Sequence, residues 1–475
     1  MRHLALIGLV AVTLLAGCSE PETHERVNVV VILADDLGYG DVSYTGGDLA
    51  TPEIDRLARE GTILDRFYCQ PKCTPTRAGL LTGRHPIRFG MQHHVVAPWE
   101  TYGLPKHERT LAEGFRDAAY PHRALFGKWH LGHAEADHHP LEHGFTEFVG
   151  HMNGRIDYFT HHRLADDAGK PIPDWHRGRE LEDVQGHYVT DLITREAVSF
   201  LEKRAADREP FFLTLSHLAP HFPNQAPPSW VKLFDHMEEP RRTYAAKVKA
   251  LDAAIGQVRR ALDDNGLSQN TLVLFLSDNG ADPTKGGSNG ALAGQKHTPY
   301  EGGVRCPAIL RWPGRVPAGV TCEAMTSYVD VFPTLAKLIG FPEGALDGRD
   351  RWGQWTEEAE DDEPNQHYVF MRSEDGRELI SLMDDEFKLV RIGMQPWDMT
   401  MPREDVKLFR YREDPEEIGD CQKVYPDKVK DMLKDLARFR ALGSRRSDPQ
   451  LKVQAVPADG WVPPADWRPG AHAAR

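Results

Sequence analysis

Two nearly continuous apolar runs mark the chain, one from Val27 to Ala34 and the other from Thr271 to Leu276. Runs without regular polar alternation are typical of strands buried on both faces of a parallel sheet. Between them, apolar residues recur at helical spacing from Pro52 to Gly61, from Tyr188 to Arg204 and from Thr243 to Asp264. This alternation of strands and helices predicts an α/β fold, in which helices sandwich a large mixed, mostly parallel sheet.

The composition of the chain changes near position 355. An acidic run at 357–363 is followed by short alternating segments and by a helical pattern over 429–442. This change predicts a main domain over residues 27–355 and a smaller C-terminal α+β domain, with its tail, over residues 356–475.

The start of the chain has the pattern of a targeting signal. A short basic segment precedes a 12-residue apolar run that ends at Leu15. A bilayer-spanning helix needs about 20 residues, so the run fits a signal peptide instead. It ends in a segment that resembles a bacterial lipobox, in which Cys18 becomes lipidated; the alternative is an ordinary signal peptide with a chance cysteine. We therefore expect a lipoprotein signal peptide at 1–18 and a tether at 19–26, and an exported protein anchored to a membrane by lipid, in the periplasm or at the outer membrane.

The formal net charge of the 475-residue chain is −14 at pH 7. Nucleic-acid binding depends on basic side chains that neutralise phosphates, so no nucleic-acid partner is expected. A few Lys and Arg side chains that converge in one pocket can still bind a smaller anion.

Polar residues follow both apolar runs. Asp35 and Asp36 follow the first, and Asp278 and Asn279 follow the second after a single serine. In open α/β sheets, sites form at the carboxyl ends of the strands. Adjacent acids there are costly to bury unless a positive charge lies between them. Their oxygens are hard ligands that suit Ca²⁺ or Mg²⁺ better than zinc, and we expect Ca²⁺ rather than Mg²⁺; the alternative is that each pair only caps the next helix or turn.

Cys73 begins the segment Cys-Thr-Pro-Thr-Arg. Thr74 can act as a cap and Pro75 suits the first helical turn, which predicts Cys73 at a helix N-terminus. The free N–H groups there favour an anion or a lowered pKa of the thiol, and Arg77 is one turn away. On these grounds alone Cys73 is either a reactive thiol or a buried structural cysteine.

The remaining cysteines, at positions 69, 306, 322 and 421, do not have the spacing of a zinc site. An oxidising compartment permits disulfides. Cys306 and Cys322 flank a predicted strand and its return turn, so they are the candidate pair.

The chain resembles the sulfatase family of the alkaline phosphatase superfamily. The resemblance rests on Cys-x-Pro-x-Arg at 73–77, followed by Leu-Leu-Thr-Gly-Arg at 80–84. Other blocks that resemble the family occur in the family's order at 28–38, 127–132, 219–221, 277–280 and 300–303. The segments at 90–94 and 144–145 are similar to the branch of arylsulfatase B, which removes 4-sulfates from N-acetylgalactosamine.

The resemblance implies that a maturation enzyme converts Cys73 into formylglycine, whose hydrated form is the nucleophile. The implied metal ligands are Asp35, Asp36, Cys73, Asp278 and Asn279. The implied catalytic residues are Cys73, Arg77, Lys128, His130, His221, Lys296 and Asp278.

Individual roles also follow from the resemblance. Asp278 accepts the proton of the nucleophile, and His130 helps to release the sulfated intermediate. Lys128, His221 and Lys296 bind the sulfate, and His221 and Lys296 also protonate the leaving oxygen. In an extended segment Lys128 and His130 would point the same way, because they are two residues apart.

Hydrolysis of sulfate esters, on a sulfated glycan or a small sulfate ester, is therefore the expected function. One alternative is a phosphonate monoester or phosphodiester hydrolase on the same scaffold. The other is a non-catalytic glycan-binding lipoprotein, which would require the loss of a core site residue.

Overall fold

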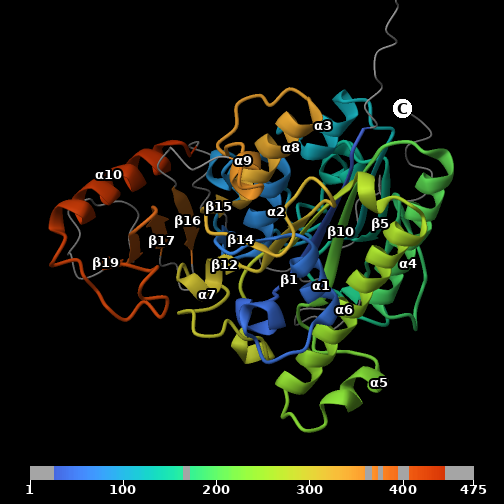
Figure 1. Cartoon of the computed structure of the whole chain (residues 1–475), viewed down its shortest axis with the longest axis horizontal. Helices are drawn as coiled ribbons and strands as arrows, with labels where there is room; N and C mark the ends of the chain where they lie inside the picture. Colours follow the sequence, from blue (N-terminus) through green and yellow to red (C-terminus); the bar gives the residue numbers. More distant parts are fainter. Residues whose placement is uncertain (1–25, 164–171, 359–365, 373–377, 394–405, 444–475) are drawn as a thin grey trace, which may run out of the picture.

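The computed structural model describes residues 26–163, 172–358, 366–372, 378–393 and 406–443 (Figure 1). Its largest sheet comprises β1 (Asn28–Asp35), β2 (Thr62–Leu64), β4 (His122–Lys128), β5 (Glu147–His151), β8 (His176–Arg177), β9 (Glu180–Leu181), β10 (Phe211–Pro220), β11 (Thr271–Ser277), β13 (Ala308–Arg311) and β14 (Val320–Cys322). The strand order is β14-β2-β13-β11-β1-β10-β4-β5-β8-β9.

The middle of this sheet is parallel. Strands β11, β1, β10, β4 and β5 all run in the same direction, whereas β13 and β8 pair antiparallel at the two sides of this group. The predicted mixed, mostly parallel sheet is confirmed. The two apolar runs form β1 and β11, which are neighbours.

Helices cover both faces of the sheet (Figure 1). Successive strand side chains point to opposite faces, so Val29 and Val31 of β1 lie in one core and Val30 and Ile32 lie in the other. The first core contains residues of α2 (Cys73–Thr82), α3 (Leu111–Asp117) and α8 (Val331–Ile339). The second contains residues of α1 (Pro52–Glu60), α4 (Val189–Asp207) and α6 (Arg241–Asp264).

A small antiparallel sheet follows in the sequence and lies beside the main sheet (Figure 1). Its strands are β16 (His367–Arg372), β17 (Glu378–Met383), β18 (Lys388–Gly393) and β19 (Val406–Phe409), and α10 (Pro426–Ala441) covers it. Leu382, Leu389 and Leu408 of the sheet pack against Met432 and Leu436 of the helix. The predicted C-terminal α+β unit is therefore present.

A buried charge cluster joins the small sheet to the main part. The ammonium of Lys388 in β18 lies 3.1 Å from a carboxylate oxygen of Glu301 and 3.1 Å from one of Glu417. All three side chains are fully buried. Glu301 belongs to the main part, at the start of α7 (Glu301–Val304), so the ion pair between Lys388 and Glu301 crosses between the two parts.

The described part also contains several 3₁₀ helices and other short elements. The latter are β3 (Phe67–Tyr68), β12 (Arg305–Cys306) and β15 (Thr326–Ser327), which form a three-stranded sheet, together with β6 (His162–Arg163), β7 (Ile172–Pro173), α5 (Pro228–Val231) and α9 (Trp352–Trp355).

The expected bond between Cys306 and Cys322 is wrong. Every cysteine in the described ranges is a free thiol. Cys306 lies in β12, which pairs with β3, whereas Cys322 lies in β14 of the main sheet and donates to the Gln354 carbonyl at 3.3 Å. The two residues are built into different sheets, which sequence spacing does not reveal.

The predicted signal peptide with Cys18, nearly all of the tether and the C-terminal tail lie outside the described residues. Within the residues that are described, no helix has both the length and the apolar character needed to cross a bilayer.

Candidate active site

Three neighbouring parallel strands bring the predicted acids to one edge of the sheet. Asp35 ends β1 and Asp36 follows it, Asp278 and Asn279 follow β11, and His221 follows β10. Since parallel neighbours end at the same edge, these side chains converge as predicted. The backbone N–H of Asp36 donates to Oδ1 of Asp278 at 3.3 Å, which places the two acid pairs in direct contact.

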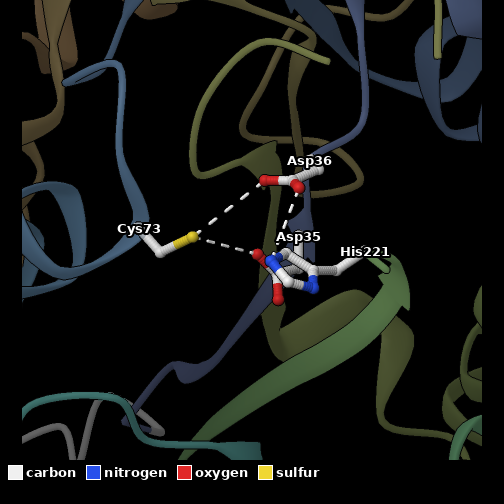
Figure 2. Close-up of side chains that lie close together, drawn as sticks. All are labelled: Asp35, Asp36, Cys73 and His221. Atoms are coloured by element: carbon white, nitrogen blue, oxygen red, sulfur yellow. Dashed lines mark hydrogen bonds and ion pairs between the residues drawn. The ribbon is translucent and has the colours of Figure 1, made fainter. Parts of the chain in front are cut away.

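Cys73 faces this edge from the first position of α2. Figure 2 shows its sulfur pointing toward Asp35 and Asp36, with the imidazole of His221 beside them. The Sγ atom lies 3.3 Å from Oδ1 of Asp35 and 4.0 Å from Oδ1 of Asp36. Nε2 of His221 lies 3.6 Å from Oδ2 of Asp36. One ligand atom from each of the four residues lies within 4.8 Å of the others.

Two buried lysines form ion pairs with the acids. Nζ of Lys128, at the end of β4, donates to Oδ2 of Asp35 at 2.6 Å. Nζ of Lys296 donates to both oxygens of Asp36 at 2.6 and 2.7 Å and lies 3.7 Å from Sγ of Cys73. Both predicted lysines therefore reach the site.

Arg77 of α2 links Asp278 to Ser216 of β10. Its Nε donates to Oδ2 of Asp278 at 2.9 Å, and its Nη1 donates to Oγ of Ser216 at 2.5 Å. Ser216 in turn donates to the carbonyl of Lys128 at 2.6 Å. Sequence reasoning missed Ser216, although its place toward the carboxyl end of β10 was a usable signal.

Thr74 does not cap α2. The N-cap residue is Lys72, and no side chain caps the helix there. The Thr74 hydroxyl instead donates to the carbonyl of His130 at 2.9 Å and accepts from the N–H of Val96 at 3.2 Å. The hydroxyl is thus engaged by two residues that are distant in sequence. The prediction that Thr74 caps the helix was therefore wrong.

His130 reaches the site by a turn and not by the predicted extended segment. Its φ angle is 59°, in the left-handed region, directly after β4 ends at Lys128. Its N–H donates to the carbonyl of Met152 at 3.0 Å. A Cβ atom at Gly154 would lie 2.5 Å from the His130 ring, so only glycine leaves room for the imidazole.

Comparison with known proteins identifies the family. The family model described as Sulfatase matches residues 27–341. The chain belongs to the sulfatase family. Every site residue described above lies within the match. The Cys-x-Pro-x-Arg signature coincides with the N-terminus of α2.

Several named sulfatases are similar to this chain. Mouse arylsulfatase J is 36% identical over 349 residues, which are 71% of this chain and 56% of that protein. Mouse N-acetylgalactosamine-6-sulfatase is 36% identical over 374 residues, covering 73% and 68%. Human arylsulfatase A is 37% identical over 346 residues, covering 68% and 66%. The alignment thus spans little more than half of arylsulfatase J. The likeness to the arylsulfatase B branch stays a prediction.

Solved structures share the fold over most of the chain. The crystal structure of Ps i-CgsB has a TM-score of 0.80 and 31% identity, covering 89% of this chain and 94% of that one. Its complex with k-i-k-neocarrahexaose has a TM-score of 0.81 at the same identity and coverage.

The electrostatics of this sulfatase site do not favour a thiolate at Cys73. Burial, followed by the charges of Asp278 and Asp35, raises the pKa of the Cys73 thiol. Burial also raises the pKa of Asp278. Burial acts in the same sense on Asp36, but Lys296, His221 and Lys128 together outweigh it and lower the pKa of that carboxyl. The reactive-thiol interpretation therefore loses the lowered pKa on which it depended.

The two site histidines are buried and surrounded by cations. Burial, aided by Lys128, lowers the pKa of His130 well below its usual value. Burial also lowers the pKa of His221, although Asp36 opposes that shift. Nδ1 of His221 lies 2.5 Å from the Phe222 carbonyl, which can only accept, so Nδ1 carries a proton and Nε2 faces Asp36.

The donor set fits a hard divalent cation. Three carboxylates gather within a fully buried site, and like charges at such distances favour a positive charge between them. Oδ1 of Asn279 is buried and accepts no hydrogen bond within the described residues, which leaves an oxygen available for a metal. Oxygen ligands of this kind suit Ca²⁺ or Mg²⁺.

Proposed function

We propose that this protein hydrolyses sulfate esters on a sulfated glycan, with a nucleophile made from Cys73. The observation that carries the proposal is the position of Cys73. Its sulfur lies between Asp35, at 3.3 Å, and Lys296, at 3.7 Å, within the matched sulfatase signature. Burial and the charges of Asp278 and Asp35 raise the pKa of this thiol, so it is poorly placed to react as a thiolate, which supports conversion to formylglycine.

The glycan part of the proposal comes from the relatives. The solved structure at 31% identity was obtained in complex with k-i-k-neocarrahexaose, and one relative is named for the 6-sulfate of N-acetylgalactosamine. The first name specifies an oligosaccharide and the second a sulfated sugar. A sulfated oligosaccharide is therefore the substrate class that we propose.

The chain's own groups divide the work of the reaction. Hydrated formylglycine would supply two hydroxyls, one to attack sulfur and one to let the modified residue return to its aldehyde. Asp278 is placed to accept a proton from the nucleophile. Lys128 and Lys296 would bind the sulfate oxygens, where charge increases during the attack. Nε2 of His221 would take up a second proton, in addition to the one on Nδ1, and pass it to the leaving oxygen, and His130 would act in release.

A divalent cation, Ca²⁺ in preference to Mg²⁺, would be held by the side chains of Asp35, Asp36, Asp278 and Asn279 together with the modified Cys73. When bound, it would lower the pKa of the attacking hydroxyl and neutralise charge on the sulfate. Arg77 would keep Asp278 in place through its hydrogen bond at 2.9 Å.

We also propose that the enzyme is a lipoprotein that a maturation enzyme modifies at Cys73 and that is anchored to a membrane through Cys18. The lipobox-like sequence before Cys18 supports the anchor. Changing Cys18→Ala should move the protein from the membrane fraction to the soluble periplasmic fraction. A variant that stays in the membrane fraction would count against a lipid anchor.

A panel of sulfated oligosaccharides, assayed by release of free sulfate, tests the proposed function. A nitrophenyl sulfate and a nitrophenyl phosphodiester should be compared in the same assay, because a phosphodiesterase on this scaffold would prefer the second. The non-catalytic alternative predicts binding without release. This alternative requires the loss of a core site residue, whereas the sequence contains every residue that the resemblance implies.

A further inference from the structure

Lys247 is a fully buried lysine on the inner face of α6. It lies one helical turn before Leu251, which belongs to the core between the helix and the sheet. A lysine is rarely found at such a position, because burying an ammonium without hydrogen-bond partners is very costly. The groups that accept hydrogen bonds from its ammonium therefore indicate the role of Lys247.

All of the ammonium's hydrogen-bond acceptors belong to one turn, residues 220–224. Nζ of Lys247 donates to the carbonyl of Pro220 at 2.7 Å, to the carbonyl of His221 at 3.0 Å and to Oδ1 of Asn224 at 2.8 Å. The carbonyl of Pro223 lies 3.4 Å away. One side chain of α6 thus holds the backbone on both sides of the His221 imidazole.

The sequence of the turn explains why it needs such a partner. Pro220 and Pro223 have no N–H group, so the turn cannot be closed by a regular ladder of backbone hydrogen bonds. Its buried carbonyls still require donors. The hydroxyl of Tyr158 donates to the His221 carbonyl at 2.9 Å, and the N–H of Gln225 donates to the Pro223 carbonyl at 3.0 Å. Lys247 is the donor to the Pro220 carbonyl and a further donor to that of His221.

The surroundings of Lys247 also connect to the acidic edge. The ammonium lies 5.9 Å from the centre of the Tyr158 ring and 5.5 Å from that of Tyr244, which stabilise a cation. The Tyr244 hydroxyl donates to the backbone carbonyl of Asp36 at 2.9 Å. The cluster of Lys247, Tyr158 and Tyr244 therefore contacts the two segments that carry His221 and Asp36.

We propose that Lys247 is a positioning residue for His221, holding the 220–224 turn so that Nε2 faces Asp36 and Cys73. The inference rests on the proposed function, in which His221 protonates the leaving oxygen. Without the ammonium, the buried carbonyls of the turn lose a donor and must move toward water or another partner. The imidazole follows them, because Nδ1 is bonded to the carbonyl of Phe222 within the same turn.

The change Lys247→Met tests this role, since methionine keeps the apolar stem and removes the donors. We expect kcat/KM for a sulfated sugar to fall about tenfold or more, because the sugar alkoxide needs a proton to leave. The loss for 4-nitrophenyl sulfate should be less than about threefold, because nitrophenolate departs without one. The matched control is Lys249→Met, two residues along the same helix, where the partly exposed ammonium pairs with Asp252 at 3.2 Å. This control should leave both substrates unchanged.

An equal loss on both substrates, or no loss on either, would overturn the positioning role. If Lys247→Met does not fold, Asn224→Ala removes one acceptor of the ammonium, together with the amide's own hydrogen bond to the Lys285 carbonyl at 2.9 Å. This variant should again lower kcat/KM for the sulfated sugar more than for nitrophenyl sulfate, on a smaller scale. An equal loss on both substrates in a well-folded Asn224→Ala variant would likewise contradict the proposal.

The position of His221 can also be measured without turnover. A crystal structure of Lys247→Met should show the imidazole displaced from Asp36, relative to the wild-type distance of 3.6 Å. An unmoved imidazole would refute the inference even if the wild type is an active sulfatase. An inactive wild type with a displaced imidazole in the variant would instead leave the positioning role standing and remove the proposed function.

Discussion

Lys296 and Asp36 form a buried two-pronged ion pair, with Nζ 2.6 Å from one carboxylate oxygen and 2.7 Å from the other. Lys128 donates to one oxygen of Asp35, Oδ2, at 2.6 Å. The lysines thus occupy oxygens that the proposed cation would use. Cation binding and release of the two ammonium groups toward a sulfate are therefore expected to be linked.

Removal of the divalent cation should lower activity and stability together. A metal that binds only the folded state stabilises it by mass action. Treatment with a chelator should lower the thermal unfolding midpoint, and added Ca²⁺ should restore both the midpoint and the activity. Asp36→Asn should abolish this response to Ca²⁺, whereas Asp431→Asn, an exposed acid on α10, should retain it. A thermal unfolding midpoint of the wild type that does not change with Ca²⁺ would contradict a metal at this edge of the sheet.

Replacing Lys128 by Ala should lower kcat/KM by about 10²-fold, comparable to the loss of one donor that stabilises a transition-state oxyanion. The effect should fall on a sulfated sugar and on nitrophenyl sulfate alike, because the ammonium binds the sulfate and not the leaving group. The matched control is Lys106→Ala, an exposed lysine that pairs with Asp137 and Glu142. Near-normal turnover by Lys128→Ala would show that this residue does not bind the sulfate.

His221→Ala should harm poor leaving groups more than good ones. A sugar alkoxide must be protonated as it departs, whereas nitrophenolate is stable as an anion. Steady-state kinetics with a sulfated sugar and with nitrophenyl sulfate measure the difference. An equal loss on the two substrates would assign the proton-donor role elsewhere, for example to Lys296.

The cluster that joins the two parts of the chain predicts a pH-dependent stability. Burial raises the pKa of Glu417 to about 7, with Glu301 acting in the same sense and Lys388 opposing it. A carboxyl that binds its proton more tightly in the folded state stabilises it below its unfolded pKa, and this contribution is lost as pH rises through the folded pKa. The unfolding midpoint of the wild type, relative to Glu417→Gln, should therefore fall between about pH 5 and about pH 8.

The control for this prediction is Glu413→Gln, an exposed acid nearby that pairs with Arg410. Its midpoint relative to the wild type should be independent of pH over the same range. A constant difference between the wild type and Glu417→Gln would show that Glu417 is ionised in the folded state throughout.

The sequence predicted the elements that are encoded locally. The two apolar runs form β1 and β11, and the periodic segments form α1, α4 and α6, because burial on both faces or on one stripe is written in the order of residues. Convergence of Asp35, Asp36, Asp278 and Asn279 also followed, since parallel strands end at one edge.

Features that depend on tertiary partners were not predictable in this way. The free thiol of Cys306 reflects its pairing in the β12–β3 sheet, and the hydroxyl of Thr74 is committed to His130 and Val96. His130 enters the site through a left-handed residue, which no sequence period indicates. Lys247 could have been noticed as a lysine on the buried face of a helix, but its partners come from a turn that is distant in sequence.

The most direct test of the central claim is sulfate release from a sulfated oligosaccharide by protein made with and without a formylglycine-generating enzyme. Mass spectrometry of the peptide that contains Cys73 gives the fraction converted from thiol to aldehyde in each preparation. We predict that the rate of sulfate release rises in proportion to the aldehyde fraction and is abolished in Cys73→Ala. Near-normal release by Cys73→Ala, or by protein whose Cys73 is entirely thiol, would contradict the assignment of Cys73 as the source of the nucleophile.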